Sequence, residues 1–445
     1  MNGQMRRWFL GTAACYVIIL GGLLYWHLAA DLGTHSANPR YYRVFSEPRG
    51  TIVDRRGEPL AVTLGEEENF RRSYAAASLT HVVGYFHPRY GMTALERIYH
   101  EELLVGRTVQ TTIDLELQLK VESLMEGRIG AAVALSPATG EVLALVSSPW
   151  IDGNVLAERW SEYSEDGRSP FLNRVTQGQY PPGSVIKPIV YGTALERELT
   201  SPDQIWNDQG VFRVDGRTVQ NFGGRSLGAI TTEEALALSS NTVFAELAVE
   251  LGDDLLSVLR RFALGSEPLW ELGGQSGFVP QRAYSDHNKA LLGIGQGELL
   301  VTPLQMGMVA AALANRGVLM QPYLVQELRG GFRLRQITRP VELGQVLSES
   351  VAAQVRDAMV LTARSGTAQG VCSDEVQLAA KTGTAQAGAK GDHAWFIGFA
   401  PSPMPQIAVA VLVEHGGTGS AAAAPIGAAI IEEALKIWNR EKGIR

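Results

Sequence analysis

The sequence predicts a mixed α/β protein that follows a membrane-spanning helix. Strand-like apolar segments occur near both ends of the region after residue 106, and helix-like segments lie between them. One sheet is therefore expected to join distant parts of the chain. With 445 residues, 45% of them hydrophobic, the chain can bury a large core and is expected to hold more than one folding unit.

An uncharged run near the N-terminus predicts the membrane helix. Residues 8–26, WFLGTAACYVIILGGLLYW, are long enough to cross the hydrocarbon layer, and aromatic residues stand at both ends. Arg6 and Arg7 precede the run, which predicts a cytoplasmic N-terminus and an extracytoplasmic body. A cleaved signal peptide is the alternative, but the run exceeds a usual signal core and HLAADLG is a poor cleavage site. We predict a cytoplasmic tail over 1–7 and a single-pass plasma-membrane anchor over 8–28.

Strand and helix patterns follow in order. RGTIVDRRGEPLAVTL predicts two strands joined by a turn, within a block of mixed character that ends at residue 106. VQTTIDLELQLKVESLM predicts a strand and then a helix, with Leu115, Leu119 and Val121 on one face. GAAVALSPATGEVLALVSSP predicts a hairpin.

The remaining segments alternate between the two element types. TTEEALALSSN carries a capping box, Thr231 with Glu234. Three strands are expected in VQLAAKTGTAQ, HAWFIGFAP and QIAVAVLVEHG. Helices are expected over 184–197, 231–240, 242–251, 299–316 and 425–440.

Charge and cysteine content exclude several classes of protein. The formal net charge is −7, whereas a nucleic-acid-binding protein would present a basic face. The two cysteines, Cys15 and Cys372, are too few for a disulfide framework, and Cys15 falls in the predicted anchor. No spacing of acidic, histidine or cysteine residues is typical of a metal site. We therefore expect no nucleic-acid partner, no metal and no cofactor.

Ser184 and Lys187 form the first candidate pair, in PPGSVIKP. Residues three apart in a helix share a face, so the amine is expected to reach the serine oxygen as the base beside a nucleophile. Only seven lysines occur, and arginine could not replace one here because the guanidinium keeps its proton. Taken alone, the pair favours a serine cap followed by a surface lysine.

Ser239-Ser240-Asn241 forms the second candidate group, between two predicted helices. Ser239 could relay a proton and Asn241 could bind a substrate amide. The structural alternative is that Asn241 caps the helix that begins at Thr242.

Lys381, Thr382, Gly383 and Thr384 form the third group, at the end of an apolar strand. The amine and the hydroxyls could hold a carboxylate, and the glycine would let a ligand backbone lie against the strand. The structural alternative is a charged edge strand that discourages aggregation.

The three groups of residues indicate a function far more specifically when they occur together than any one of them does alone. Ser-x-x-Lys, Ser-x-Asn and Lys-Thr-Gly in this order are the serine acyl-transferase set of penicillin-binding proteins and β-lactamases. Four further segments are family-like: RGTIVDRRGEPLA (49–61), GYFHPRYGMTALERIY (84–99), GIGQGELLVTPLQMG (293–307) and HAWFIGFAP (393–401). The sequence thus resembles a class B penicillin-binding protein, a monofunctional peptidoglycan D,D-transpeptidase.

This resemblance implies a fold and a division into domains. It implies the penicillin-binding transpeptidase fold over 107–445, with an antiparallel sheet flanked by helices and a helical subdomain. Residues 29–106 would form a reduced, mostly β pedestal. That stretch is too short for the glycosyltransferase domain of class A members.

The resemblance also implies catalytic roles. Neutral Lys187 would take the proton of Ser184, which would attack the penultimate D-alanine of a D-Ala-D-Ala stem peptide. Ser239 would pass a proton to the departing D-alanine. The backbone N–H groups of Ser184 and Thr384 would hold the oxyanion. An amine of a second stem peptide would resolve the acyl-enzyme, and β-lactam antibiotics would block it covalently.

Substrate binding would fall to the remaining motif residues. Lys381, Thr382 and Thr384 would bind the terminal carboxylate, and Asn241 the peptide amide. The donor peptide would lie along the strand at Gly383. The resemblance alone also implies a membrane-bound glycosyltransferase partner of the SEDS type.

Several alternatives compete with this interpretation. A D,D-carboxypeptidase or a β-lactamase-like hydrolase would use the same motifs, and a non-catalytic cell-wall scaffold or a β-lactam sensor would need no turnover. GRSLG matches a hydrolase elbow, but no helix is expected directly after it, so Ser226 is assigned to a loop. His393 and His415 lack an obvious third partner for a serine triad.

Overall fold

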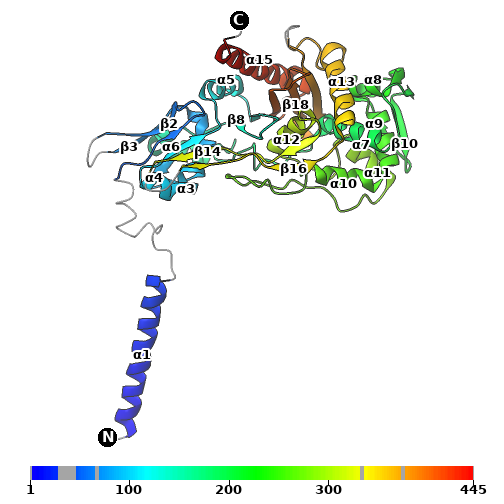
Figure 1. The fold of residues 1–445 in the computed structure, drawn as a ribbon. Helices are drawn as coiled ribbons and strands as arrows, with labels where there is room; N and C mark the ends of the chain where they lie inside the picture. Colours follow the sequence, from blue (N-terminus) through cyan, green and yellow to red (C-terminus); the bar gives the residue numbers. More distant parts are fainter. Residues whose placement is uncertain (1–2, 29–46, 66–69, 331–334, 372–375, 444–445) are drawn as a thin grey trace.

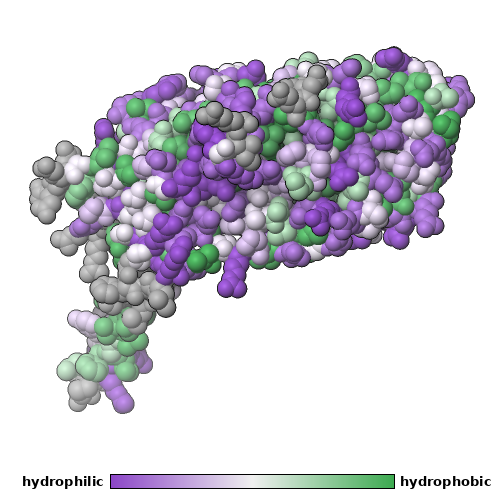
Figure 2. Space-filling view, turned by 45° about the horizontal axis from the view of Figure 1, so that its top comes forward, coloured by the Kyte–Doolittle hydropathy of each residue, from purple (hydrophilic) through white to green (hydrophobic). Residues whose placement is uncertain are grey.

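The computed structural model describes residues 3–28, 47–65, 70–330, 335–371 and 376–443 (Figure 1). Helix α1 (Gly3–Leu28) stands apart from the body of the molecule and is long and apolar enough to span a membrane. Figure 2 shows its apolar side chains on the surface, whereas the body presents a mixed, largely hydrophilic face. Cys15 is a free, exposed thiol on this helix, and Cys372 lies outside the described residues.

A five-stranded antiparallel sheet forms the centre of the body. Its order is β17-β18-β19-β7-β8, so strands from the two ends of the region lie side by side, as the sequence predicts. Their bounds are β7 (Gly130–Leu135), β8 (Val142–Ser148), β17 (Ala379–Ala385), β18 (His393–Ala400) and β19 (Ile407–Val413).

Helices cover both faces of this sheet, which explains its nearly continuous apolar strands. Alternate strand residues point to opposite faces, and they divide between two apolar clusters: Val133 and Ala410 lie in one, and Ala132 and Val411 in the other. The first cluster contains α12, and the second contains α5 and α15 (Figure 1). Their bounds are α5 (Leu115–Met125), α12 (Pro303–Ala314) and α15 (Ala424–Glu441).

The buried face of helix α5 contains only part of the predicted set of apolar residues. Asp114 caps it by accepting from the Leu117 N–H, and Leu117, Val121 and Met125 are buried. Leu119 is 45% exposed whereas Val121 is 1% exposed, so the prediction that the two share one face is wrong. Residues four apart share a helix face, and the sheet selects the row that starts at Leu117.

A helical subdomain packs beside β17. Thr231 and Glu234 form the predicted capping box at the N-terminus of helix α8 in this subdomain. The helices of this region are η3 (Gly183–Ile186), α7 (Lys187–Glu196), α8 (Thr232–Ala237), α9 (Asn241–Leu251), α10 (Asp253–Arg261), α11 (Asp286–Gly293) and α13 (Glu349–Ser365). Two antiparallel strand pairs accompany them: β9 (Ile205–Asp208) with β12 (Gly228–Thr231), and β10 (Val211–Val214) with β11 (Arg217–Gln220).

The N-terminal region shares a sheet with later residues. This sheet has six strands in the order β15-β14-β6-β1-β2-β3. Two of them, β14 and β15, come from beyond residue 320, so the sheet crosses the predicted domain boundary at residue 106. That boundary stays a prediction, and residues 29–46 lie outside the described ones. The strands are β1 (Ile52–Val53), β2 (Pro59–Leu64), β3 (Arg71–Tyr74), β6 (Thr108–Thr111), β14 (Val325–Arg329) and β15 (Gln336–Ile337).

Short elements complete the described residues. They are η1 (Ala77–His81), β4 (Phe86–His87), β5 (Gly91–Met92), α3 (Ala94–Ile98), α4 (His100–Leu104), η2 (Gly153–Val155), α6 (Leu156–Glu165), η4 (Phe222–Gly224), β13 (Val318–Met320), β16 (Glu342–Gln345), η5 (Gly388–Lys390) and α14 (Gly419–Ala422).

A buried ion cluster holds the N-terminal region together. Glu96 is fully buried and accepts from Arg49 Nε at 3.1 Å and from Arg72 Nε at 2.6 Å. Arg49 also donates to the Glu96 carbonyl oxygen at 3.0 Å. One carboxylate therefore neutralises two guanidinium groups that come from different segments.

We predict that Glu96→Ala lowers the free energy of unfolding by about 3–5 kcal/mol, because it leaves two buried cations without a counter-charge. Thermal or urea unfolding measures the loss. Glu101→Ala, at an exposed position of α4, is the control and should change stability little. A Glu96→Ala protein as stable as the control would show that this cluster does not stabilise the fold.

Candidate active site

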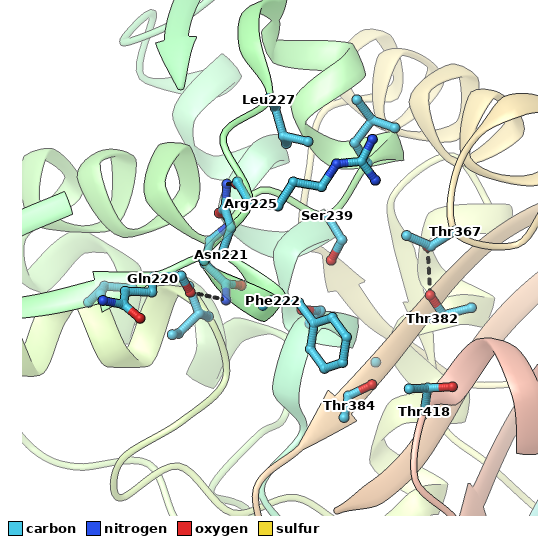
Figure 3. Close-up of a pocket in the computed structure, with 18 of the residues that line it drawn as sticks. Gln220, Asn221, Phe222, Arg225, Leu227, Ser239, Thr367, Thr382, Thr384 and Thr418 are labelled. Carbon is cyan, nitrogen blue, oxygen red and sulfur yellow. Dashed lines mark hydrogen bonds between the residues drawn. The ribbon is translucent and has the colours of Figure 1, made fainter. Parts of the chain in front are cut away.

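A cleft of about 1120 Å³ lies between β17 and the helical subdomain. Figure 3 shows Thr382 and Thr384 of β17 on one side, the loop from Gln220 to Leu227 on the other, and Ser239 between them. The cleft is slightly larger than the volumes typical of small-molecule pockets. It brings the three sequence motifs together.

Ser184 lies in η3, at the start of the segment that continues as α7, and faces this cleft. The residue before it, Gly183, has a φ of +56°, and a Cβ there would stand 2.7 Å from the Thr384 carbonyl oxygen. On its other side a Cβ on Gly295 would stand 2.0 Å from the Gly183 carbonyl oxygen, and Gly183 N donates to Gly295 O at 2.8 Å. The two glycines thus let the backbones at residues 183, 295 and 384 meet directly beside Ser184.

Lys187 is the first residue of α7 and is fully buried. Its Nζ donates to Asn241 Oδ1 at 2.7 Å and to the Ser239 carbonyl oxygen at 2.8 Å, and Ser239 Oγ lies 3.3 Å away. The alternative of a surface lysine is therefore wrong.

Burial lowers the pKa of Lys187 well below its usual value, because desolvation disfavours the charged amine. The nearby Lys381 lowers this pKa further, whereas the carboxylate of Asp208 raises it. A neutral amine has two N–H groups and one lone pair. Asn241 Oδ1 and the Ser239 carbonyl oxygen can accept hydrogen bonds from the two N–H groups. The lone pair of the amine then stays free to accept a proton.

Ser239 lies between the two lysines. Its Oγ accepts from Lys381 Nζ at 2.9 Å and lies 3.3 Å from Lys187 Nζ. Its φ is +62°, an uncommon conformation for a residue with a side chain. This backbone geometry turns both its carbonyl and its hydroxyl toward the lysines.

Asn241 does not cap its helix. Ser240 is the cap, since its Oγ accepts from Val243 N, so the structural alternative for Asn241 is wrong. Asn241 Nδ2 donates to the Gln220 carbonyl oxygen at 2.7 Å. This bond fixes the orientation of the amide and directs Oδ1 to Lys187.

Lys381 is also fully buried, although β17 is an edge strand of its sheet. Its Nζ donates to Ser239 Oγ and to the Thr382 carbonyl oxygen, both at 2.9 Å. Desolvation lowers its pKa to about 7. The alternative of a solvated, charged edge is therefore wrong.

The other residues of the third motif line the cleft with their backbone and hydroxyl groups. Thr382 Oγ1 donates to Thr367 Oγ1 at 2.6 Å (Figure 3), and Thr384 Oγ1 accepts from Gly419 N at 3.4 Å. A Cβ on Gly383 would stand 3.0 Å from a methyl group of Val185. The glycine is thus needed for contact with the serine segment.

One expected contact and two competing sites do not occur among the described residues. The side chains of Ser184 and Lys187 share no hydrogen bond in this part of the chain, although the Lys187 backbone N–H donates to the Ser184 carbonyl oxygen. Ser226 donates to the Asp208 carbonyl oxygen and leads into strand β12, so it is no hydrolase elbow. His393 and His415 contact each other and backbone atoms, and the described residues contain no cluster of potential metal ligands.

Sequence reasoning missed three polar residues at the site. Thr367 orients Thr382, and Asn221 and Asp208 hydrogen-bond to residues of the Ser239–Asn241 turn. None of them belongs to a recognisable spacing. Only the folded chain brings them to the motifs.

Comparisons with known proteins agree with this geometry. Residues 130–432 match the model of the penicillin binding protein transpeptidase domain. The peptidoglycan D,D-transpeptidase PbpA of Mycolicibacterium smegmatis is 34% identical, over 98% of this chain and 99% of that protein. A ceftriaxone acyl-enzyme structure of penicillin-binding protein A from Mycobacterium tuberculosis is 32% identical with a TM-score of 0.84, over 88% of this chain and 99% of that one. The D,D-transpeptidase domain of a peptidoglycan glycosyltransferase from Eggerthella lenta is 30% identical with a TM-score of 0.83, over 89% and 100%.

We predict that the protein becomes more stable between pH 7 and pH 9. The pKa of Lys381 is about 7 in the folded chain against 10.5 for the free side chain. Between these two values the unfolded state binds more protons than the folded state, so the free energy of unfolding rises with pH. Each such lysine contributes up to about 1.4 kcal/mol per pH unit. The lowered pKa of Lys187 acts in the same direction.

Urea unfolding at pH 7 and pH 9 measures this gain. Lys381→Met should show a smaller gain than the wild type, and Lys436→Met, at an exposed position of α15, should show the full one. An equal gain in all three proteins would contradict the burial of a neutral amine at residue 381.

Proposed function

Because this chain belongs to the penicillin-binding protein transpeptidase family, we propose that it is a peptidoglycan D,D-transpeptidase that acts through an acyl-enzyme on Ser184. One observation carries the proposal. A fully buried lysine, three residues after the serine, binds the Ser-x-Asn turn and lies near the lysine of the Lys-Thr-Gly strand. Stem peptides ending in D-Ala-D-Ala are the substrates, and β-lactams acylate the same serine.

Acylation begins with proton transfer. Neutral Lys187 takes the proton of Ser184 Oγ, which attacks the carbonyl carbon of the penultimate D-alanine. The carbonyl oxygen becomes an oxyanion that accepts from the backbone N–H groups of Ser184 and Thr384. The close approach of Gly183 to Thr384 supports this pairing, because it holds the two backbones together.

Ser239 completes the step. Its hydroxyl, within 3.3 Å of both amines, passes a proton from Lys187 to the nitrogen of the leaving D-alanine as the C–N bond breaks. Lys381, with Thr382 and Thr384, holds the terminal carboxylate. One N–H of Asn241 is used by the Gln220 carbonyl, and the second is available for a carbonyl of the stem peptide.

The donor peptide adds a strand to β17. This strand is the edge of the sheet and borders the cleft, so its free backbone groups can pair with an extended peptide. An amine of a second stem peptide then attacks the ester carbonyl, forms the cross-link and releases Ser184.

The composition of the cleft favours transfer over hydrolysis. A β-lactamase or carboxypeptidase with rapid deacylation needs a base that activates water. Asp392, just before β18, is the only carboxylate among the described residues that line the cleft. A slowly hydrolysed acyl-enzyme is therefore expected.

The membrane arrangement follows from α1. With Arg6 and Arg7 before the apolar run, the N-terminus lies in the cytoplasm and the transpeptidase region lies outside. Family membership also supports a SEDS-type glycosyltransferase partner, for which α1 and the pedestal are the contact surfaces.

We predict that penicillin adds one acyl group to the full-length protein and that the adduct persists for hours. Intact mass spectrometry of the detergent-solubilised chain follows it. Ser184→Ala should remove the adduct, and Ser226→Ala should keep it because Ser226 only braces a loop. An adduct in Ser184→Ala would refute the assignment of the nucleophile, and rapid loss in the wild type would favour a β-lactamase.

We predict that Lys187→Arg lowers the acylation rate constant by about 10²–10⁴-fold, because a guanidinium keeps its proton and cannot act as the base. Lys381→Arg should lose much less, since the carboxylate of a bound ligand favours the charged form of residue 381 and a guanidinium keeps that charge. Stopped-flow acylation and melting curves of both variants test the difference. Acylation of folded Lys187→Arg within a few-fold of the wild-type rate would mean that another group is the base.

A further inference from the structure

The turn that carries Ser239 and Asn241 is held by two buried side chains, Asp208 and Asn221, and Asn221 also borders the cleft (Figure 3). Asp208 ends β9 and is 2% exposed, and Asn221 follows β11 and is 7% exposed. Both come from the segment between α7 and α8. Neither belongs to the three sequence motifs.

Asn221 binds the turn directly. Its Oδ1 accepts from the backbone N–H groups of Asn241, at 2.7 Å, and Thr242, at 3.2 Å. These are two of the first N–H groups of α9, which have no partner within the helix. Its Nδ2 donates to both carboxylate oxygens of Asp208 and to the Arg225 carbonyl, each at 2.9 Å.

Asp208 binds the other side of the same turn. Its carboxylate accepts from Ser240 Oγ at 2.6 Å and from Gly210 N at 2.7 Å, in addition to Asn221 Nδ2. Ser240 Oγ in turn caps α9. The carboxylate therefore connects β9, the loop after β11 and the N-terminus of α9.

The turn needs such support for two reasons. Ser239 has a φ of +62°, a strained conformation for a residue with a side chain, which persists only where neighbours enforce it. The turn also supplies both close acceptors of Lys187 Nζ, the Ser239 carbonyl and Asn241 Oδ1. A displaced turn would therefore release the lysine.

We propose that Asp208 and Asn221 are positioning residues, which hold the Ser239–Asn241 turn and through it the amine of Lys187 in the geometry for acylation. The proposal rests on the proposed function of Ser184. It assigns this chain a buried polar brace, Asp208–Asn221–Ser240, behind its proton-transfer groups.

The brace also balances charge at the site. The charged groups that act on Lys187 are Lys381 on β17, which lowers its pKa, and Asp208 on β9, which raises it. Removal of the Asp208 charge should therefore lower the pKa of Lys187 further. The amine would then become neutral, and the protein competent for acylation, at a lower pH.

The test measures acylation of the full-length, detergent-solubilised protein by a fluorescent penicillin between pH 5.5 and pH 9. Asn221→Ala removes the acceptor of the turn, and Asp208→Asn removes the charge with little change of shape. Asn173→Ala is the matched control. Asn173 is 8% exposed, donates to the His81 carbonyl and accepts from Val175 N, outside the cleft lining. Melting temperatures are recorded for all variants.

The brace predicts different outcomes for the three variants. Asn221→Ala should acylate about 10²-fold more slowly at every pH, the usual effect of a misplaced catalytic group. Asp208→Asn should shift the acidic limb of the profile to lower pH. Asn173→Ala should lower the melting temperature without changing rate or profile.

Two results would overturn the brace. The first is that Asn221→Ala is acylated at a rate within a few-fold of that of Asn173→Ala. The second is that Asp208→Asn shows the same pH profile of acylation as the wild type. The second result decides the test if Asn221→Ala does not fold. Wild-type labelling that does not depend on Ser184 would instead refute the proposed function. The two failures are therefore distinguishable.

Discussion

The burial of the Lys187 amine is the constraint on which the rest of the cleft depends. A lysine in this position loses its hydration, which lowers its pKa and favours the neutral, hydrogen-bonded amine. Its close acceptors, the Ser239 carbonyl and Asn241 Oδ1, come from a turn more than fifty residues away in the sequence. The chemistry of the site therefore depends on how the helical subdomain is held against the sheet.

The fold meets this requirement through close backbone contacts. Glycines at 183, 295 and 383 let the serine segment, the segment after α11 and the edge strand β17 approach one another more closely than side chains would permit. Apolar helices cover both faces of the sheet and keep β17 in place, while its edge stays open to the cleft. The same rigid strand thus presents Lys381 to Ser239 and offers free backbone groups to a peptide.

Much of this arrangement could be predicted from the sequence, because its signals are local. Spacing located the three motifs, and short apolar runs bounded by turn residues located the strands of the sheet. The grouping of Leu119 with Val121 on one face of α5 was wrong, since two apolar rows compete and only the sheet decides between them. Asp208, Asn221 and Thr367 gave no signal because their partners lie far away in the chain. The sharing of one sheet between the N-terminal region and β14 is likewise a long-range pairing.

The protonation state of Lys187 tests the account most directly. With only seven lysines in the chain, the side-chain carbons of ¹³C-labelled lysine can be followed by NMR through a pH titration of the unacylated protein. The account predicts that the signal absent from Lys187→Arg titrates well below 10.5. A Lys187 signal that titrates together with those of the exposed lysines would contradict it, because the serine would then stand beside a cation instead of a base.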